Sequence, residues 1–195
     1  MSEEKVGKRF KASVQEIISY LNLNVELLNA TSLHEFIALI INTHRSENRV
    51  FIYGAGRSGF LGRCFAQRLM HLGINSCFVS DAVTYRYTKE DLLILISGSG
   101  ETTSPVAIAR EARKIDGKIV LLTGNPESTI GKISTLSLKI QGKSKDIAIE
   151  KETLAPYTSL FDISTLALLD SVGGILMDQL GVSEEDIDKR HASIE

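Results

Sequence analysis

The chain has 195 residues, a hydrophobic share of 43%, and 22 basic against 24 acidic residues, for a formal net charge of −2. This length suits one α/β domain with a sizeable core, and we expect a single domain over residues 1–195. The balanced charge offers no basic surface, so we expect no nucleic-acid partner. The longest apolar runs fall short of the roughly 18–20 residues that a membrane helix needs, and no signal-peptide stretch follows the charged start. We therefore expect a cytoplasmic protein with no membrane contact.

Residues 1–46 form the predicted N-terminal helical segment. A second helix is predicted to start near Thr31–Ser32. The apolar residues of the first helix recur at helical spacing: Val14, Ile17, Ile18, Leu21, Val25 and Leu28.

Residues 47–140 alternate between short apolar runs and helical patterns. Such alternation predicts an α/β fold, a three-layer doubly wound sheet of about five parallel strands with N-terminal and C-terminal helices around it. The apolar runs predict buried strands at 50–54, 77–80, 92–97, 118–124 and 136–140, with helices at about 57–72 and 103–115 and a short one near 127–133.

The last part of the chain, residues 156–195, is predicted to be helical after a crossing loop at 141–155. From Tyr157 to Leu180 the sequence is apolar around much of a helix circumference, which indicates a central helix or one buried between subunits. Ser183 and Asp186 have the spacing of a capping box, and they are predicted to start a final helix that carries His191.

The first predicted strand runs into Gly54-Ala55-Gly56-Arg57-Ser58-Gly59, which satisfies the G-x-G-x-x-G pattern. Asp81 follows the second strand, about where a ribose-binding carboxylate would stand in a dinucleotide site. Binding of NAD is therefore one open interpretation. Two features argue against it: the chain has little room for a separate catalytic domain, and the third strand ends in a second polar loop that a dinucleotide site does not need.

That second loop is Ser97-Gly98-Ser99-Gly100-Glu101-Thr102-Thr103, between an apolar strand and a predicted helix. Small residues let the backbone approach a ligand, and the N–H groups of a helix start together with three hydroxyls can donate to phosphate oxygens. The alternative is that the serines only cap the helix and shape the turn. Because the lysine of a nucleotide triphosphatase loop is absent, the pattern predicts a cradle for a simpler phosphate ester.

These stretches resemble the sugar isomerase (SIS) domain family, and within it the 6-phospho-3-hexuloisomerases. The resemblance covers residues from about 50 to the C-terminus and rests on GAGRSGF at 54–60, RLMHLG at 68–73, SGSGETT at 97–103, TGNPES at 123–128, AP-x-x-SLFD at 155–162, LLD at 168–170 and RHASIE at 190–195. It implies interconversion of D-arabino-hex-3-ulose 6-phosphate and fructose 6-phosphate, with no cofactor and no metal, in a homo-oligomer that is a tetramer or a dimer.

The resemblance also implies roles for single residues. It places the phosphate of a phosphorylated ketose on Ser97, Ser99 and Thr102, and the sugar beside Gly56, Arg57 and Ser58. Both loops follow strand carboxyl ends, where open α/β sheets bind ligands.

Moving a carbonyl between C2 and C3 requires a base and an acid, for which a carboxylate and an imidazole are suited. Asp162 stands where the family has a glutamate, one methylene shorter, and Asp81-Ala82 is a second departure from the family pattern. His191 matches the C-terminal histidine of the family and is predicted to shuttle protons or open the ring, in its own or a neighbouring subunit. Glu101 is an alternative base, or simply a favourable acid in the first turn of a helix.

Two further residues have plainer roles as the favoured alternatives. Glu152 is a lesser candidate for the base, and the favoured interpretation is that it is a solvated charge in a loop. For His71 the favoured interpretation is a packed or interface histidine. Alternative substrates include arabinose 5-phosphate and other sugar phosphates, because the cradle recognises only the phosphate. A sugar-phosphate sensor is the remaining alternative, although residues 1–46 lack the extra basic helix-turn-helix that such a regulator needs.

Overall fold

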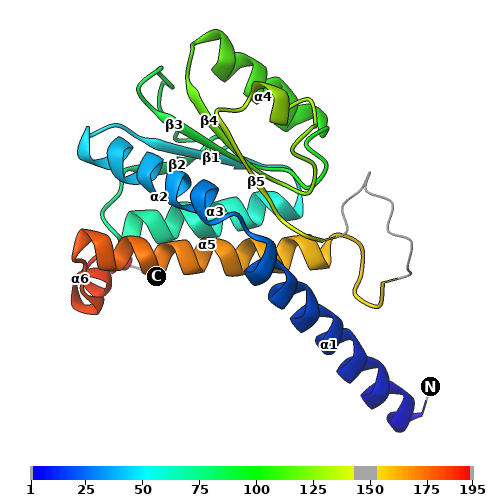
Figure 1. The fold of residues 1–195 in the computed structure, drawn as a ribbon. Coiled ribbons are helices and arrows are strands. Elements are labelled where there is room, and N and C mark those ends of the chain that lie inside the picture. The colour runs from blue at the N-terminus through cyan, green and yellow to red at the C-terminus, as the bar shows by residue number, and fades with distance from the viewer. Residues whose placement is uncertain (1, 143–152, 194–195) are drawn as a thin grey trace.

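A five-stranded parallel sheet forms the centre of the molecule (Figure 1). The computed structural model describes residues 2–142 and 153–193. The strands are β1 (Val50–Gly54), β2 (Ser76–Phe78), β3 (Leu92–Ile96), β4 (Lys118–Thr123) and β5 (Leu136–Lys139), and their order is β2-β1-β3-β4-β5. The order in which the chain adds strands therefore reverses between β1 and β3, which is the switch point where doubly wound sheets bind ligands.

Helices cover both faces of the sheet, as the alternation of apolar and helical segments predicted. Side chains such as Ile52 and Ile94 belong to the core on the side of α2 (Ala30–Arg45) and α3 (Arg57–His71). Their neighbours Phe51 and Leu93 belong to a second core on the side of α4 (Thr103–Lys114). Since successive side chains of a strand point to opposite faces, these apolar runs fill both cores, and the three-layer α/β fold is confirmed.

The helix α5 (Ser159–Leu180) packs against α3 and α1 (Glu3–Leu27), and its residues Leu169, Val172 and Leu176 are buried in the first core. By length and composition alone α5 could cross a membrane, but half of its most apolar stretch is buried within the molecule. The buried half of this helix belongs to the core of the fold.

The N-terminal helix α1 has no buried residue and projects from the body of the molecule (Figure 1). The second helix begins at Ala30, slightly earlier than predicted, because the Asn29 side chain rather than Thr31 or Ser32 caps it: Asn29 Oδ1 accepts a hydrogen bond of 2.9 Å from the Ser32 N–H. The side-chain amide of Asn29, directly after Leu27 and Leu28, was the cap that the prediction overlooked.

The C-terminal end differs from the prediction in one respect. The capping box of Ser183 and Asp186 is present and starts the short helix α6 (Glu184–Lys189). That helix ends two residues before His191, so the prediction that the final helix carries His191 is wrong. The short helix predicted near 127–133 is the 3₁₀ turn η1 (Gly131–Ile133). Most of the loop predicted at 141–155, Glu152 included, lies outside the described residues.

Candidate active site

A cavity of about 270 Å³ opens at the carboxyl ends of β1 and β3. It therefore lies at the switch point of the sheet, and α5 closes its third side. Its lining comes from three stretches of chain far apart in the sequence: Ala55, Arg57 and Ser58; Ile96, Ser97, Gly98, Ser99, Thr102 and Pro105; and Tyr157, Thr158, Phe161 and Asp162. Six of the residues predicted from the sequence meet here: Arg57, Ser58, Ser97, Ser99, Thr102 and Asp162.

The loop after β3 has the form of an anion cradle. Ser97 Oγ accepts a hydrogen bond of 3.1 Å from the Gly100 N–H, and Ser99 Oγ accepts one of 3.2 Å from the Glu101 N–H. Both serines are buried and line the cavity, and because their oxygens act as acceptors in these bonds, each hydroxyl keeps its O–H proton as a donor. Thr102 is the N-cap of α4 but makes no side-chain capping bond, so the first N–H groups of α4 also face this end without a cap.

The loop after β1 brings the backbone of α3 unusually close to the strand. A Cβ on Gly54 would lie 2.6 Å from the carbonyl oxygen of Ser58, so only glycine fits there. Gly56 has φ +57°, a left-handed conformation that glycine adopts without strain. Gly56 itself does not line the cavity, but this tight turn positions Arg57 and Ser58, which do.

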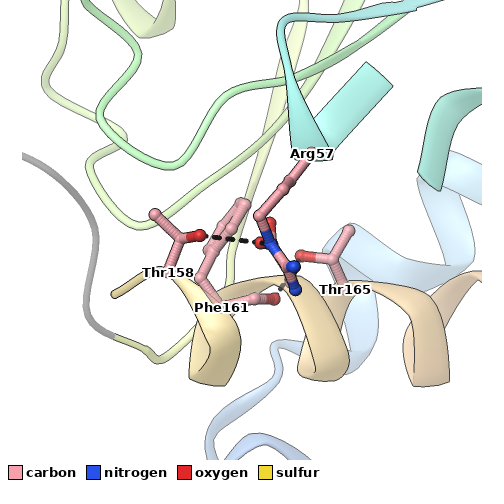
Figure 2. Close-up of polar contacts among 5 residues, drawn as sticks. Arg57, Thr158, Phe161 and Thr165 are labelled. Atoms are coloured by element: carbon pink, nitrogen blue, oxygen red, sulfur yellow. Dashed lines mark hydrogen bonds and ion pairs between the residues drawn. The ribbon is translucent and has the colours of Figure 1, made fainter. Parts of the chain in front are cut away.

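Asp162 is the buried charged group of the site, with 2% of its surface exposed. Its Oδ2 accepts two hydrogen bonds of 2.8 Å, from Arg57 Nε and from the Thr158 hydroxyl, which converge on it from α3 and from the start of α5 (Figure 2). Its Oδ1 is buried and has no hydrogen-bond partner among the described residues. A buried carboxylate oxygen without a donor is rare in folded proteins, and here it belongs to a residue that lines a cavity.

Two features compensate the negative charge of Asp162. The Arg57 guanidinium forms an ion pair with it although the arginine side chain is 65% exposed. Asp162 also lies in the first turn of α5, where the helix dipole favours an anion. One oxygen of this carboxylate thus has an arginine partner, while the other lacks a donor among the described residues.

Glu101, the alternative base, lies outside the cavity lining. Its Oε1 accepts a hydrogen bond of 2.7 Å from the Thr129 N–H. Hydrogen bonding from Thr129, by its side chain first and then by its backbone, holds the pKa of the Glu101 carboxyl below its usual range. Glu101 therefore ties the cradle loop to the loop after β4.

His191 lies at the far end of α3 from the cavity. Its ring packs on the His71 ring with centroids 4.2 Å apart, and Arg190 donates a hydrogen bond of 3.0 Å to the His71 carbonyl oxygen. The 15 residues of α3 span roughly 21 Å at a helical rise of about 1.5 Å each, and Arg57 is at the other end. Within one chain the structure does not bring His191 to Asp162. His71 is buried and packed, as the plainer interpretation of it predicted.

The dinucleotide interpretation finds little support in the geometry. Asp81 forms an ion pair of 2.8 Å with Arg63 at the surface. The strand order is also not the order 3-2-1-4-5-6 of the dinucleotide-binding fold. In the parts of the chain that the structure describes, no three His, Cys, Asp or Glu side chains cluster in a way that could hold a metal ion.

The sequence analysis missed the contribution of Thr158, together with the apolar and aromatic lining from Tyr157 and Phe161. A signal was present: Thr158 precedes Asp162 by four residues, a spacing that places two side chains on the same face of a helix. The left-handed backbone of Thr158 could not be inferred from the sequence.

Comparisons with known proteins identify the family of the chain. A model of the SIS domain matches residues 44–167. The chain is 35% identical over 183 residues to the 3-hexulose-6-phosphate isomerase of Bacillus subtilis (strain 168), an alignment that covers 93% of this chain and 97% of that protein. The chain therefore belongs to the SIS domain family, and its resemblance to that family is confirmed.

Two solved structures have the same fold. A Methanococcus jannaschii protein, whose structure infers a molecular function of 3-hexulose-6-phosphate isomerase, aligns with a TM-score of 0.79 at 32% identity, over 96% of this chain and 99% of that one. An Escherichia coli CFT073 protein, solved in complex with a phosphosugar, aligns with a TM-score of 0.77 at 26% identity, over 98% of this chain and 100% of that one.

Proposed function

We propose that this protein is a 3-hexulose-6-phosphate isomerase, which interconverts D-arabino-hex-3-ulose 6-phosphate and fructose 6-phosphate through an enediol. The observation that carries the proposal is the buried carboxylate of Asp162 in the same cavity as the serine-rich cradle, with Oδ1 lacking a partner among the described residues. The relative from Bacillus subtilis that carries this name supports the choice of substrate.

In this mechanism the serine-rich cradle binds the phosphate and the Asp162 carboxylate transfers the proton. The hydroxyls of Ser97, Ser99 and Thr102 and the N-terminus of α4 bind the 6-phosphate, which fixes the sugar with respect to Asp162. Asp162 then takes the proton from C2 of the 3-ketose, and the C3 oxygen gains a proton, giving the enediol. Return of the proton to C3 and loss of the O2 proton give the 2-ketose.

The hydroxyl protons need a second group, and we propose His191 of another copy of the chain for this role. His191 of the same chain lies beyond α3 and is packed on His71. An imidazole titrates near neutral pH and is therefore suited to move protons between two oxygens. This assignment makes the active site a joint product of two copies.

We propose that α1 provides contact between copies. Of the thirteen exposed large apolar side chains in the described residues, seven lie on α1: Val6, Phe10, Val14, Ile18, Leu23, Val25 and Leu27. Val6, Phe10, Val14 and Ile18 recur every four residues, which forms the ridge that packs between the ridges of a second helix. Covering the four side chains of this ridge would remove apolar surface from water, which favours association. Light scattering of Phe10→Glu should show smaller particles than the wild type, and an unchanged mass would contradict this contact.

The test of the function is turnover of both hexulose phosphates by the purified chain, with arabinose 5-phosphate as the alternative substrate. Turnover of arabinose 5-phosphate alone would make it a different sugar-phosphate isomerase, and binding of fructose 6-phosphate without turnover would favour a non-catalytic module.

The shared site has its own test. Asp162→Asn and His191→Ala should each lose most of the activity. Hybrids formed by refolding the two variants together should regain activity, because one site of such a pair combines both intact residues. Hybrids without activity would contradict the role of His191 across copies.

A further inference from the structure

The backbone at the start of α5 is strained at one residue. Thr158, the N-cap of α5, has φ +66° and ψ −13°, in the left-handed region. For a β-branched residue this conformation is a real outlier, because Cβ and the neighbouring carbonyl oxygen crowd each other. A glycine or an asparagine at this turn would form it more easily, so the threonine requires a reason.

Capping of the helix is not that reason. A threonine at an N-cap normally accepts a hydrogen bond from the backbone of the first turn, but Thr158 makes no side-chain capping bond. Its hydroxyl instead donates a hydrogen bond of 2.8 Å to Asp162 Oδ2, one turn further along the helix. The side chain is therefore directed to the carboxylate and not to the helix backbone.

The chain before Thr158 is held firmly, as strained residues require. The Glu16 carboxylate of α1 accepts hydrogen bonds from the backbone N–H groups of Leu154, at 2.9 and 3.0 Å, and Ala155, at 2.7 Å. Arg9 donates a hydrogen bond of 3.0 Å to the Leu154 carbonyl oxygen. These contacts from α1 and the turn bond from the Ser159 N–H to the Pro156 carbonyl fix the entry to α5.

The two donors to Asp162 act on the same oxygen. Arg57 Nε and the Thr158 hydroxyl both bind Oδ2, from opposite elements, so the carboxylate cannot rotate freely about its Cβ–Cγ bond. Oδ2 is stabilised as an acceptor, and Oδ1 is the oxygen that no described residue binds. The two oxygens of Asp162 are therefore not equivalent.

We propose that Thr158 is a positioning residue for the reaction. Together with Arg57 it binds Oδ2 and fixes the orientation of the Asp162 carboxylate in the site. The left-handed backbone of Thr158 is the conformation that brings its hydroxyl to the carboxylate. This inference rests on the proposed isomerase function and adds to it a residue that does not touch the reacting carbons.

Three variants separate the hydroxyl from the backbone. Thr158→Ser keeps the hydroxyl. Thr158→Ala removes the hydroxyl but keeps a Cβ, and so the backbone strain, at the left-handed position. Thr158→Gly removes the hydroxyl and also relieves that strain. We expect kcat to fall about 10- to 100-fold in the alanine and glycine variants, because small misplacements of a catalytic group reduce rates on this scale, and to recover in the serine variant. KM should change by less than about threefold, because Thr158 does not bind the phosphate. Because both variants lack the hydroxyl and only alanine keeps a Cβ in the left-handed region, the glycine variant should melt at a temperature equal to or above that of the alanine variant.

The pH dependence gives a readout that a purely structural role would not change. A hydrogen bond to a carboxylate favours its charged form, so loss of the Thr158 hydroxyl should move the acidic limb of the kcat/KM profile to higher pH. A glycine variant with wild-type kcat and an unshifted acidic limb would overturn the proposal, and so would a loss confined to KM.

A failure of the proposed isomerase function can be distinguished from a failure of the positioning role of Thr158. Absence of turnover by the wild-type chain on every hexulose and pentose phosphate would contradict the isomerase and the catalytic part of this inference together. Crystal structures of the wild type and Thr158→Gly would still decide the positioning: we expect the Asp162 carboxylate to rotate or become disordered in the variant, and an unchanged carboxylate would contradict it.

Discussion

The two ends of α5 have the same backbone conformation but different residues. Thr158 precedes the helix at φ +66°, and Gly181 follows it at φ +63°. At Gly181 the left-handed turn only ends the helix: the Gly181 N–H bonds to the Asp178 carbonyl oxygen, and the Val182 N–H bonds to that of Met177. At Thr158 the same turn also directs a hydroxyl to a buried carboxylate.

The difference separates structural from functional use of one conformation. Glycine adopts the left-handed region without strain, so its presence at the C-terminal end needs no explanation beyond stability. A threonine in that region is disfavoured, and the end where it occurs is the end that lines the cavity. The N-terminal end of α5 should therefore respond to mutation mainly in activity, and the C-terminal end mainly in stability.

The largest effect is expected at Asp162. Asp162→Asn keeps the size of the side chain but removes the base, and kcat should fall by about 10²- to 10⁴-fold. Steady-state kinetics on fructose 6-phosphate measures this. The matched control is Asp170→Asn on the same helix, whose side chain forms a surface ion pair of 3.2 Å with Arg68. Comparable losses in both variants would mean that Asp162 matters through its charge on the helix and not as a base.

The buried C-terminal half of α5 should show the largest loss of stability. Leu176 is fully buried in the first core, and Leu176→Ala should lower the free energy of unfolding by about 2–5 kcal/mol. Denaturant unfolding measures it, with Ile115→Ala at an exposed position as control. At a temperature where the variant is folded, its KM should match that of the wild type. A large rise in KM would contradict the expectation that the C-terminal end of α5 affects mainly stability.

The cradle should respond in binding. Ser99→Ala removes one hydroxyl donor to the phosphate, and affinity for fructose 6-phosphate should fall roughly tenfold, which corresponds to about 1.4 kcal/mol. Calorimetric titration measures the affinity, and thermal melting checks that folding is less affected. Ser104→Ala, on an exposed residue outside the cavity lining, is the control. An unchanged affinity in Ser99→Ala would contradict the cradle assignment.

A smaller effect on stability is expected at Gly181. Gly181→Ala forces an L-residue into the left-handed region and should destabilise the protein by about 1 kcal/mol, with no change in kcat. Gly174→Ala is the opposite control on the same helix, because a Cβ there meets no atom within 4 Å and alanine favours a helix interior. Thermal melts that rank the two variants in the reverse order would contradict this account of the C-terminal end.

The smallest effect is a pH dependence at the capping box of α6. The hydrogen bonds from Ser183 lower the pKa of the Asp186 carboxyl below its usual range. Because the folded-state pKa is lowered, the stabilisation is present at neutral pH, above the unfolded value of about 4, and is lost as the pH falls below it. The difference in melting temperature between the wild type and Asp186→Asn should therefore shrink between about pH 6 and about pH 3. A difference that stays constant over this range would show that charge on Asp186 is not involved.

Much of the fold follows from local patterns in the sequence. Runs such as VFIYG at 50–54 and LLILI at 92–96 became buried parallel strands, because a strand covered on both faces has to be apolar at every position. The boundaries were less accurate, since a single cap such as Asn29, or the left-handed Thr158 before Ser159, decides where a helix starts.

The site was predictable where its chemistry lies within one loop. Ser97 and Ser99 belong to one turn between a strand and a helix, and the residues of that turn alone indicate an anion site. His191 and Glu101 could not be placed in this way. Their positions depend on which distant segment they pack against, which is His71 for His191 and Thr129 for Glu101.

The sequence alone thus determined the α/β layers and the family resemblance, and it predicted the serine-rich loop that lines the cavity, because apolar periodicity and glycine-rich turns act over a few neighbouring residues. Only the tertiary structure decided that Arg57 and Thr158 bind the same oxygen of Asp162 and leave the other without a partner among the described residues. The reason is physical: residues 57 and 162 are 105 positions apart, and their 2.8 Å contact exists only after the sheet, α3 and α5 have packed together.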